Sequence, residues 1–354
     1  MQPVFYNDQV LRLPDWPAPD RQLWLAGLEP GDILEGGAYA AGLQPTTLRN
    51  SARGYGRWLG VLAHLDPPAL LLPPADRVTP ARMRLLLRAL RREGNTNNTI
   101  KARCWEMRSA LRIMLPDRDF RWLNKPAGRS LEVLLPTVRK PIRLMSIAEL
   151  TTWGHDLMRD GMAARPSRRT EDFRNGLLVA ILADRAPRLR SLASLRLGRG
   201  IRRYGPCYRL TFRIKDTKGK RFLEYDLHPS LTTRIDHYLT VERPRLLDVQ
   251  NHDWFWVNRD GSRLDEVGIT GVTWRGSQAR FGFAFGTHRF RSALATAGTV
   301  TSAATAATVA AVLGNSPAVA ERYYVIGGQI EAARSLHETL AGIRAGTQDG
   351  SPAG

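Results

Sequence analysis

Three successive segments near the start of the chain place their apolar residues three and four positions apart, the spacing of one helix face. Each follows a helix-start or turn signal, and proline pairs at 67–68 and 73–74 separate the first segment from the second. The pattern predicts an all-helical domain at 33–120, preceded by an irregular, proline-containing strap at 1–32. The apolar residues are Leu48, Tyr55, Trp58, Leu59 and Leu62, then Met83, Leu85, Leu86, Leu87, Ala89 and Leu90, and then Ile100, Cys104, Met107, Leu111 and Met114.

The second half of the chain mixes helix and strand patterns. Ser146 and Glu149 form a capping box that predicts the start of a second domain, and the basic stretch 121–145, with two proline-containing segments, is predicted to be an interdomain linker. The expected fold class is therefore mainly α with a small antiparallel sheet (α+β). Helices are predicted at 170–183, at 235–241 and over most of the chain from 287 onward, and strands at 208–215, 221–227 and 254–258.

The charge of the chain constrains its partners. Its 52 Lys and Arg residues face 33 Asp and Glu residues, which gives a formal charge of +19 at pH 7. An excess of this size indicates a polyanionic partner, for which DNA, RNA or a membrane surface would all serve. The two cysteines, Cys104 and Cys207, argue against a disulfide framework and a zinc site. No signal peptide and no apolar run of about 20 residues stands out, so we expect a cytoplasmic protein.

Basic and hydroxyl-bearing residues in the last half suggest one phosphate-handling site. Arg188 is followed by leucines at i+4 and i+7, which would bury one face of a helix and fix the direction of the arginine. His288 and Arg291 lie at i and i+3, so both leave one helix on the same face. Arginine suits this task because its planar guanidinium donates two hydrogen bonds to phosphate oxygens and stays charged.

In this order and at these separations, the residues resemble the active site of the tyrosine recombinases, the phage-integrase family. The matching positions are Arg188, Lys218 in a polar turn between two strands, His288, Arg291, Asn315 and Tyr324. The resemblance implies a helical core-binding (SAM-like) domain at 33–120 and a catalytic domain at 146–326. It also implies that the C-terminal helix and tail at 327–354 dock on a neighbouring protomer.

The resemblance implies a role for each of these residues. Tyr324 is the nucleophile, nine residues after Asn315, and forms a 3′-phosphotyrosine. Arg188 and Arg291 stabilise the charge on the phosphorane, and Lys218 protonates the leaving 5′-oxygen. His288 holds a phosphate oxygen or handles the tyrosine proton, and the Asn315 amide donates a hydrogen bond to the phosphate.

Two assignments stay open between neighbouring residues. Lys215 and Lys220 compete with Lys218 for the role of general acid, because the register of the polar turn is uncertain. Tyr323 competes with Tyr324, since a shift of one residue would promote it. The chain also departs from the family at two positions. Ser191 stands where a carboxylate is frequent, and Asn315 stands where histidine or tryptophan is usual.

The implied activity is site-specific recombination of double-stranded DNA, typical of the integrases of mobile genetic elements, with neither metal nor nucleotide cofactor. Implied partners are a tetramer of this chain on two DNA sites and accessory DNA-bending proteins, in the nucleoid of a bacterium or the host of a phage. The alternatives are a DNA-binding relative without activity, a type IB topoisomerase and a structural nucleoid protein.

Overall fold

The structure is a computed structural model that describes residues 10–32, 34, 38–137, 145–163, 166–214, 217, 222–247, 251–301 and 313. The chain divides into two compact units, Met1–Pro141 and Ile142–Gly354, and the boundary falls within the predicted linker stretch 121–145. Each unit has its own apolar core. No helix in the described ranges is long and apolar enough to cross a membrane.

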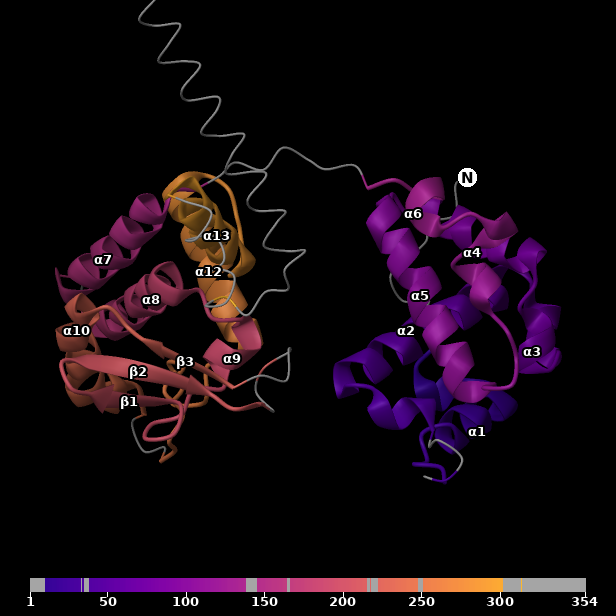
Figure 1. Cartoon of the computed structure of the whole chain (residues 1–354), viewed down its shortest axis with the longest axis horizontal. Coiled ribbons are helices and arrows are strands. Elements are labelled where there is room, and N and C mark those ends of the chain that lie inside the picture. Colours follow the sequence, from indigo (N-terminus) through magenta and orange to yellow (C-terminus); the bar gives the residue numbers. More distant parts are fainter. Residues whose placement is uncertain are drawn as a thin grey trace, which may run out of the picture. The chain divides into compact units, whose positions relative to one another are not determined.

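The first unit is a helical bundle, drawn in indigo to magenta in Figure 1. The three helices predicted from apolar spacing are present, and their stripes line the core, where Trp58 and Met107 are fully buried. The side chains of Thr79 and Thr96 accept hydrogen bonds from the backbone N–H groups of Arg82 and Thr99, which fixes two helix starts. The helices are α1 (Ala18–Ala26), α2 (Pro45–Leu65), α3 (Pro74–Arg77), α4 (Pro80–Arg92), α5 (Asn97–Met114) and α6 (Leu131–Leu134).

The stretch predicted to be an irregular strap differs from that prediction, because part of it is helix α1 and belongs to the core. Trp16 and Trp24 are each 3% exposed and meet edge to face, with ring centroids 5.7 Å apart. Asp20, fully buried, accepts hydrogen bonds from Tyr55 at 2.7 Å and from Arg77 at 2.5 Å. The prolines of this stretch suggested an irregular segment, but Pro17 is the N-cap of α1 and Pro19 lies in its first turn, where proline is tolerated.

Most of the predicted linker also belongs to the first unit. Leu123, Leu131 and Leu135 are buried in its core, and Lys101 on α5 donates a hydrogen bond to Glu132 at 2.5 Å. The basic residues masked this apolar pattern in the sequence. Residues 138–144, which complete the linker, lie outside the described residues.

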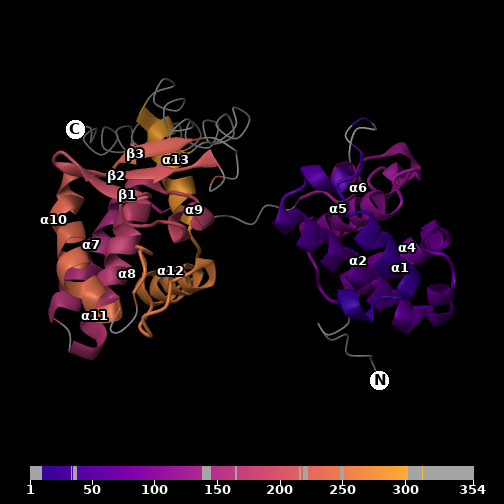
Figure 2. The ribbon, with the colours of Figure 1, turned by 90° about the horizontal axis from the view of Figure 1, so that it is seen from below.

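The second unit combines helices with a small antiparallel sheet that lies along one edge of the unit (Figure 2). The predicted capping box starts α7: the hydroxyl of Ser146 accepts from the N–H of Glu149 at 3.1 Å, and the Glu149 carboxylate accepts from the N–H of Ser146 at 2.8 Å. Gly154 and Gly176 allow α7 and α8 to pack closely, because a Cβ on either would lie within 3.0 Å of the facing helix backbone. The helices are α7 (Ile147–Ala163), α8 (Pro166–Arg185), α9 (Leu189–Ala193), α10 (Thr232–His237), α11 (Arg243–Leu247), α12 (Glu266–Phe281) and α13 (His288–Thr301).

The sheet has the order β1 (Ile201–Tyr204), β2 (Cys207–Phe212) and β3 (Leu223–Asp226), and both pairings are antiparallel. The two predicted hairpin strands correspond to β2 and β3. The strand predicted at 254–258 is not part of this sheet, because its residues form only isolated bridges, such as that between Arg196 and Trp254. The sequence reading missed β1, a four-residue edge strand whose last three residues are exposed.

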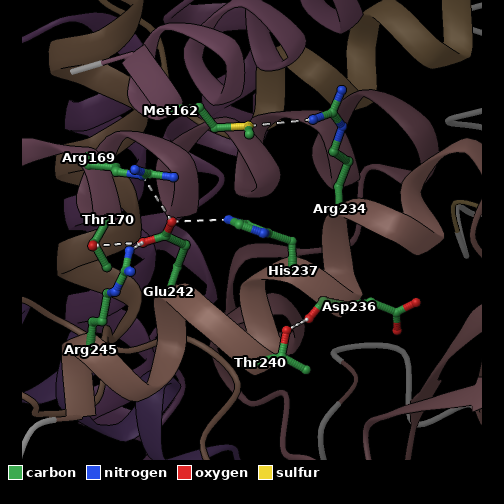
Figure 3. A network of polar contacts seen from close by, with 9 residues as sticks. All are labelled: Met162, Arg169, Thr170, Arg234, Asp236, His237, Thr240, Glu242 and Arg245. Carbon is green, nitrogen blue, oxygen red and sulfur yellow. Dashed lines mark hydrogen bonds and ion pairs between the residues drawn. The ribbon is translucent and has the colours of Figure 1, made fainter. Parts of the chain in front are cut away.

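A polar network at the N-terminal end of α8 fixes that helix against the chain that follows the sheet (Figure 3). Glu242, fully buried at the end of a π-helical turn (Tyr238–Glu242), accepts hydrogen bonds from Thr170 at 2.8 Å and His237 at 3.1 Å. Arg169 and Arg245 add ion pairs at 3.6 and 3.5 Å. Since Arg188 follows the other end of α8, the network restrains the helix that leads to the candidate site.

Candidate active site

Arg188 is placed by an abrupt end to α8. Ala186 adopts a left-handed conformation, with φ of 43°, and its N–H bonds the carbonyl of Leu182, an arrangement that ends helices. Pro187 cannot continue the helix, and Arg188 takes an extended conformation as the N-cap of α9. Leu192 and Leu195 are buried in the core, as the leucine spacing predicted, so α9 is anchored and Arg188 remains half-buried.

Arg291 joins two segments that are far apart in the sequence. It lies on the first turn of α13 and is 7% exposed. Its Nη1 donates a hydrogen bond to the carbonyl of Ala186 at 2.7 Å, and its Nη2 donates to the carbonyl of Leu313 at 2.6 Å. Ala186 lies two residues before Arg188, and Leu313 lies two residues before Asn315. One guanidinium group therefore holds together the backbone just before Arg188 and the backbone at Leu313.

His288 is the first residue of α13 and is exposed. Its pKa lies below the usual value, first because the ring is partly withdrawn from water, and then because Arg291 and Arg289 are positively charged neighbours. The lowered pKa favours the neutral imidazole, which is the form that can accept a proton. It lies on the same helical turn as Arg291, as the i, i+3 spacing predicted.

The sheet contributes a residue that sequence reasoning did not single out. Tyr225 on β3 is buried, and burial raises the pKa of its phenol, while the charges of Arg291 and Arg188 act in the opposite direction. The charges of both arginines thus act on one inward-facing side chain of the sheet. The alternation of Leu223, Tyr225 and Leu227 was the signal that could have placed Tyr225 inward.

Several predicted site residues lie outside the described residues: Lys218, with its rivals Lys215 and Lys220, Asn315, and Tyr324 with its rival Tyr323. Next to Lys218, Thr217 is buried and its hydroxyl donates to the carbonyl of Ile214 at 3.2 Å. Ser191, at the position expected for a carboxylate, is buried on α9. The structure thus brings Arg188, His288 and Arg291 to one region of the second unit. Within the described ranges, no group of three or more histidine, cysteine or acidic side chains could hold a metal ion.

No family model and no curated protein sequence matches the chain. Solved structures do match it. XerH, a site-specific recombinase bound to palindromic difH substrate in a post-cleavage complex, superposes with a TM-score of 0.57 at 16% identity, covering 86% of this chain and 90% of its own. A pre-cleavage XerH complex with difH substrate superposes with a TM-score of 0.57 at 17% identity, covering 91% of this chain and 88% of its own. The Tn1549 transposon integrase in complex with transposon right end DNA superposes with a TM-score of 0.56 at 11% identity, covering 88% of this chain and 98% of its own.

At these identities the likeness concerns the fold. It extends over most of each chain and includes both the helical bundle and the mixed unit. The chain has the fold of the tyrosine recombinases that its sequence resembles.

Proposed function

We propose that this chain is a site-specific recombinase, or integrase, that cleaves and rejoins DNA through a 3′-phosphotyrosine. The observation that carries the proposal is the position of Arg291. Its bonds to the carbonyls of Ala186 and Leu313 link the segment of Arg188 to the one that leads to Asn315 and Tyr324. A fold likeness alone would not require candidate residues more than 100 positions apart to converge.

In the proposed reaction the Tyr324 hydroxyl attacks a backbone phosphorus, and the bond from phosphorus to the 5′-oxygen breaks. Neutral His288 accepts the tyrosine proton, and Lys218 donates a proton to the departing 5′-oxygen. Arg188 and Arg291 stabilise the charge of the phosphorane, to which Asn315 donates a further hydrogen bond. The free 5′-hydroxyl of a partner strand reverses the step, so the phosphodiester bond energy is conserved.

The proposed partner is double-stranded DNA, which the charge of +19 would attract. We assign DNA binding to the helical unit, over 33–120, and catalysis to 146–326. Residues 327–354 carry Ile330, Ala333, Leu336, Leu340 and Ile343 at helical spacing. That apolar stripe supports the proposal that this segment docks on a neighbouring protomer, in a tetramer on two DNA sites.

A nicked suicide duplex tests the proposed chemistry. The wild-type protein should form a covalent adduct with the DNA, in excess EDTA as well as in magnesium. Tyr324→Phe should abolish the adduct and leave DNA affinity nearly unchanged, because it removes one hydroxyl and no charge. Tyr323→Phe is the matched control and should retain the adduct. An adduct that survives Tyr324→Phe but not Tyr323→Phe would move the nucleophile by one residue, and a requirement for magnesium would contradict the mechanism.

One specific observation favours a second candidate, a DNA-binding relative without activity. Ser191 stands where the family often has a carboxylate, and Asn315 stands where histidine or tryptophan is usual. Such a protein would bind the duplex and form no adduct. A type IB topoisomerase would form the adduct and relax supercoiled plasmid that lacks paired sites, whereas a recombinase would require two specific sites.

A further inference from the structure

A cavity of about 320 Å³ lies in the second unit, apart from the candidate catalytic residues. Arg196, Arg199, Arg213 and Trp254 line it, together with the ends of α9 and β2. Three arginines therefore border one small space. Asp253, which pairs with Arg196 at 2.5 Å and with Arg199 at 3.4 Å, balances only part of this charge.

The wall formed by Trp254 is held in place on two sides. The guanidinium carbons of Arg196 and Arg263 each lie 3.7 Å from the centre of the Trp254 ring. Arg263 also donates a hydrogen bond to the carbonyl of Ala193 at 2.9 Å, at the last residue of α9. Arg196 is thereby fixed by both a cation–π contact and an ion pair, which reduces the entropy lost when it binds a ligand.

The cavity is directly connected to the candidate active site through the backbone. Arg188 caps the start of α9, and Ser194, at the other end of this five-residue helix, borders the cavity. At 1.5 Å per residue, the two ends are separated by roughly 10 Å. Arg213, which also borders the cavity, follows the end of β2, five residues before Lys218 in the sequence. In Figures 1 and 2, α9 lies beside these strand ends.

We propose that this cavity is a second phosphate site, which binds a backbone phosphate of the DNA whose scissile phosphate lies at Arg188 and Arg291. The inference rests on the proposed function. Because Arg196 and Arg263 already stack on Trp254, recognition falls to guanidinium N–H groups, which match phosphate oxygens better than the face of a base. A separation of roughly 10 Å lies within the span of a few nucleotides of one strand, so one duplex can reach both sites.

The test compares two double variants with the same loss of charge. Arg199→Ala with Arg213→Ala empties two sides of the cavity. Both arginines are exposed, and neither substitution touches the Arg196–Trp254–Arg263 stack. The control is Arg159→Ala with Arg259→Ala, also exposed and paired with carboxylates. Arg259 pairs with Glu171, and Gly161, two residues after Arg159, faces Phe173. The control pair therefore lies along the first half of α8, roughly 20–25 Å from Arg188.

The readout is the affinity for a 30-base-pair duplex carrying the recombination site between about 50 and 200 mM salt. Each phosphate contact contributes about 0.9 to the slope of log affinity against log salt. We expect the slope of the cavity variant to fall by about 0.9, because one phosphate contact is lost, and that of the control to stay within about 0.5. Arg199→Lys with Arg213→Lys should restore the slope, because lysine keeps the charge and so keeps counterion release.

A methylphosphonate scan of the same duplex locates the contact, since each substitution removes one phosphate charge. Besides the scissile phosphate, the wild-type protein should lose affinity at one phosphate within a few nucleotides of the cleavage position, and the cavity variant should be insensitive there. Equal slopes for the cavity and control variants, in a wild-type protein that binds DNA, would overturn this inference and leave the proposed function intact. A wild-type protein with no salt-dependent DNA binding would overturn both. A third outcome is that inorganic pyrophosphate binds the wild-type protein but not the cavity variant, while the two proteins bind DNA equally well. That result would assign the cavity to a free phosphate ligand and overturn the DNA proposal.

Discussion

At the scale of single residues, Ala186 explains how Arg188 and Arg291 are placed together. Its φ of 43° is unusual for a residue with a Cβ, yet it ends α8 and turns the Ala186 carbonyl toward Nη1 of Arg291. The residue is fully buried, so neighbouring atoms limit what can replace it. No apolar spacing or charge pattern in the sequence predicts a left-handed residue at this position. The sequence could therefore suggest Arg188 and Arg291 as site residues, but not the backbone contact that connects their segments.

Substitutions at Ala186 should separate backbone strain from side-chain size. Ala186→Gly relieves about 1–2 kcal/mol of left-handed strain, offset by about 0.4–1 kcal/mol of added freedom in the unfolded chain, so stability and cleavage should be nearly unchanged. Ala186→Val should lower the free energy of unfolding by about 2 kcal/mol or more and slow single-turnover cleavage, because a β-branched residue resists this φ. Urea unfolding and cleavage of the suicide duplex measure both effects. A valine variant as stable and as fast as the wild type would contradict the account.

His288 makes a prediction about pH. In the unfolded chain the pKa of this histidine is about 6.5, and in the folded protein it is lower. The unfolded chain therefore binds the extra proton more readily. The free energy of unfolding should therefore fall as pH drops through about 6.5, and this part of the loss should be absent in His288→Gln. Urea titrations of both proteins between pH 5 and pH 8 give the difference. Curves that run parallel through that range would show that the environment of His288 is not as described.

At the scale of elements, apolar periodicity predicted α2, α4 and α5, and a capping box predicted the start of α7. The 16-residue helix α12 and the pieces that join the helices were not predicted. Trp16 and Trp24 pack α1 into the core of the first unit, although the prolines of this segment had suggested irregular structure. Leu131 likewise packs into that core, in a stretch whose basic residues had suggested a linker. Short elements such as β1 carry too few residues for a period to emerge. Their positions depend on tertiary contacts, which local sequence does not encode.

The Glu242 network makes a prediction at this scale. Burial alone would raise the pKa of Glu242, but hydrogen bonds from Thr170 and His237 and the charge of Arg245 hold it below the usual value. Its stabilising effect should be present above about pH 4.5 and be lost as pH falls further. At pH 7, Glu242→Gln should lower the free energy of unfolding by about 1–3 kcal/mol.

Glu171→Gln is the matched control for this change. Glu171 is partly exposed and pairs with Arg259 at 3.7 Å, so its substitution should cost less than about 1 kcal/mol. Urea unfolding at pH 7 compares the two variants. Equal losses would show that the buried network does not hold the start of α8.

At the scale of the whole molecule, a helical unit and a mixed unit together carry a charge of +19 and the fold of the tyrosine recombinases. The sequence alone suggested this fold from six residues in a fixed order. The structure adds the contacts by which Arg291 links two distant segments, while Lys218, Asn315 and Tyr324 remain assigned by sequence. The central claim is thus that Tyr324 becomes covalently bonded to DNA.

Mass spectrometry of the trapped protein–DNA adduct tests this claim most directly. After nuclease and trypsin treatment, cleavage following Arg322 and Arg334 releases residues 323–334, which contain both candidate tyrosines. The account predicts that this peptide carries a nucleotide and that fragmentation places it on the second of the two tyrosines, Tyr324. A nucleotide on any other residue, or an adduct-free protein that still binds the duplex, would contradict it.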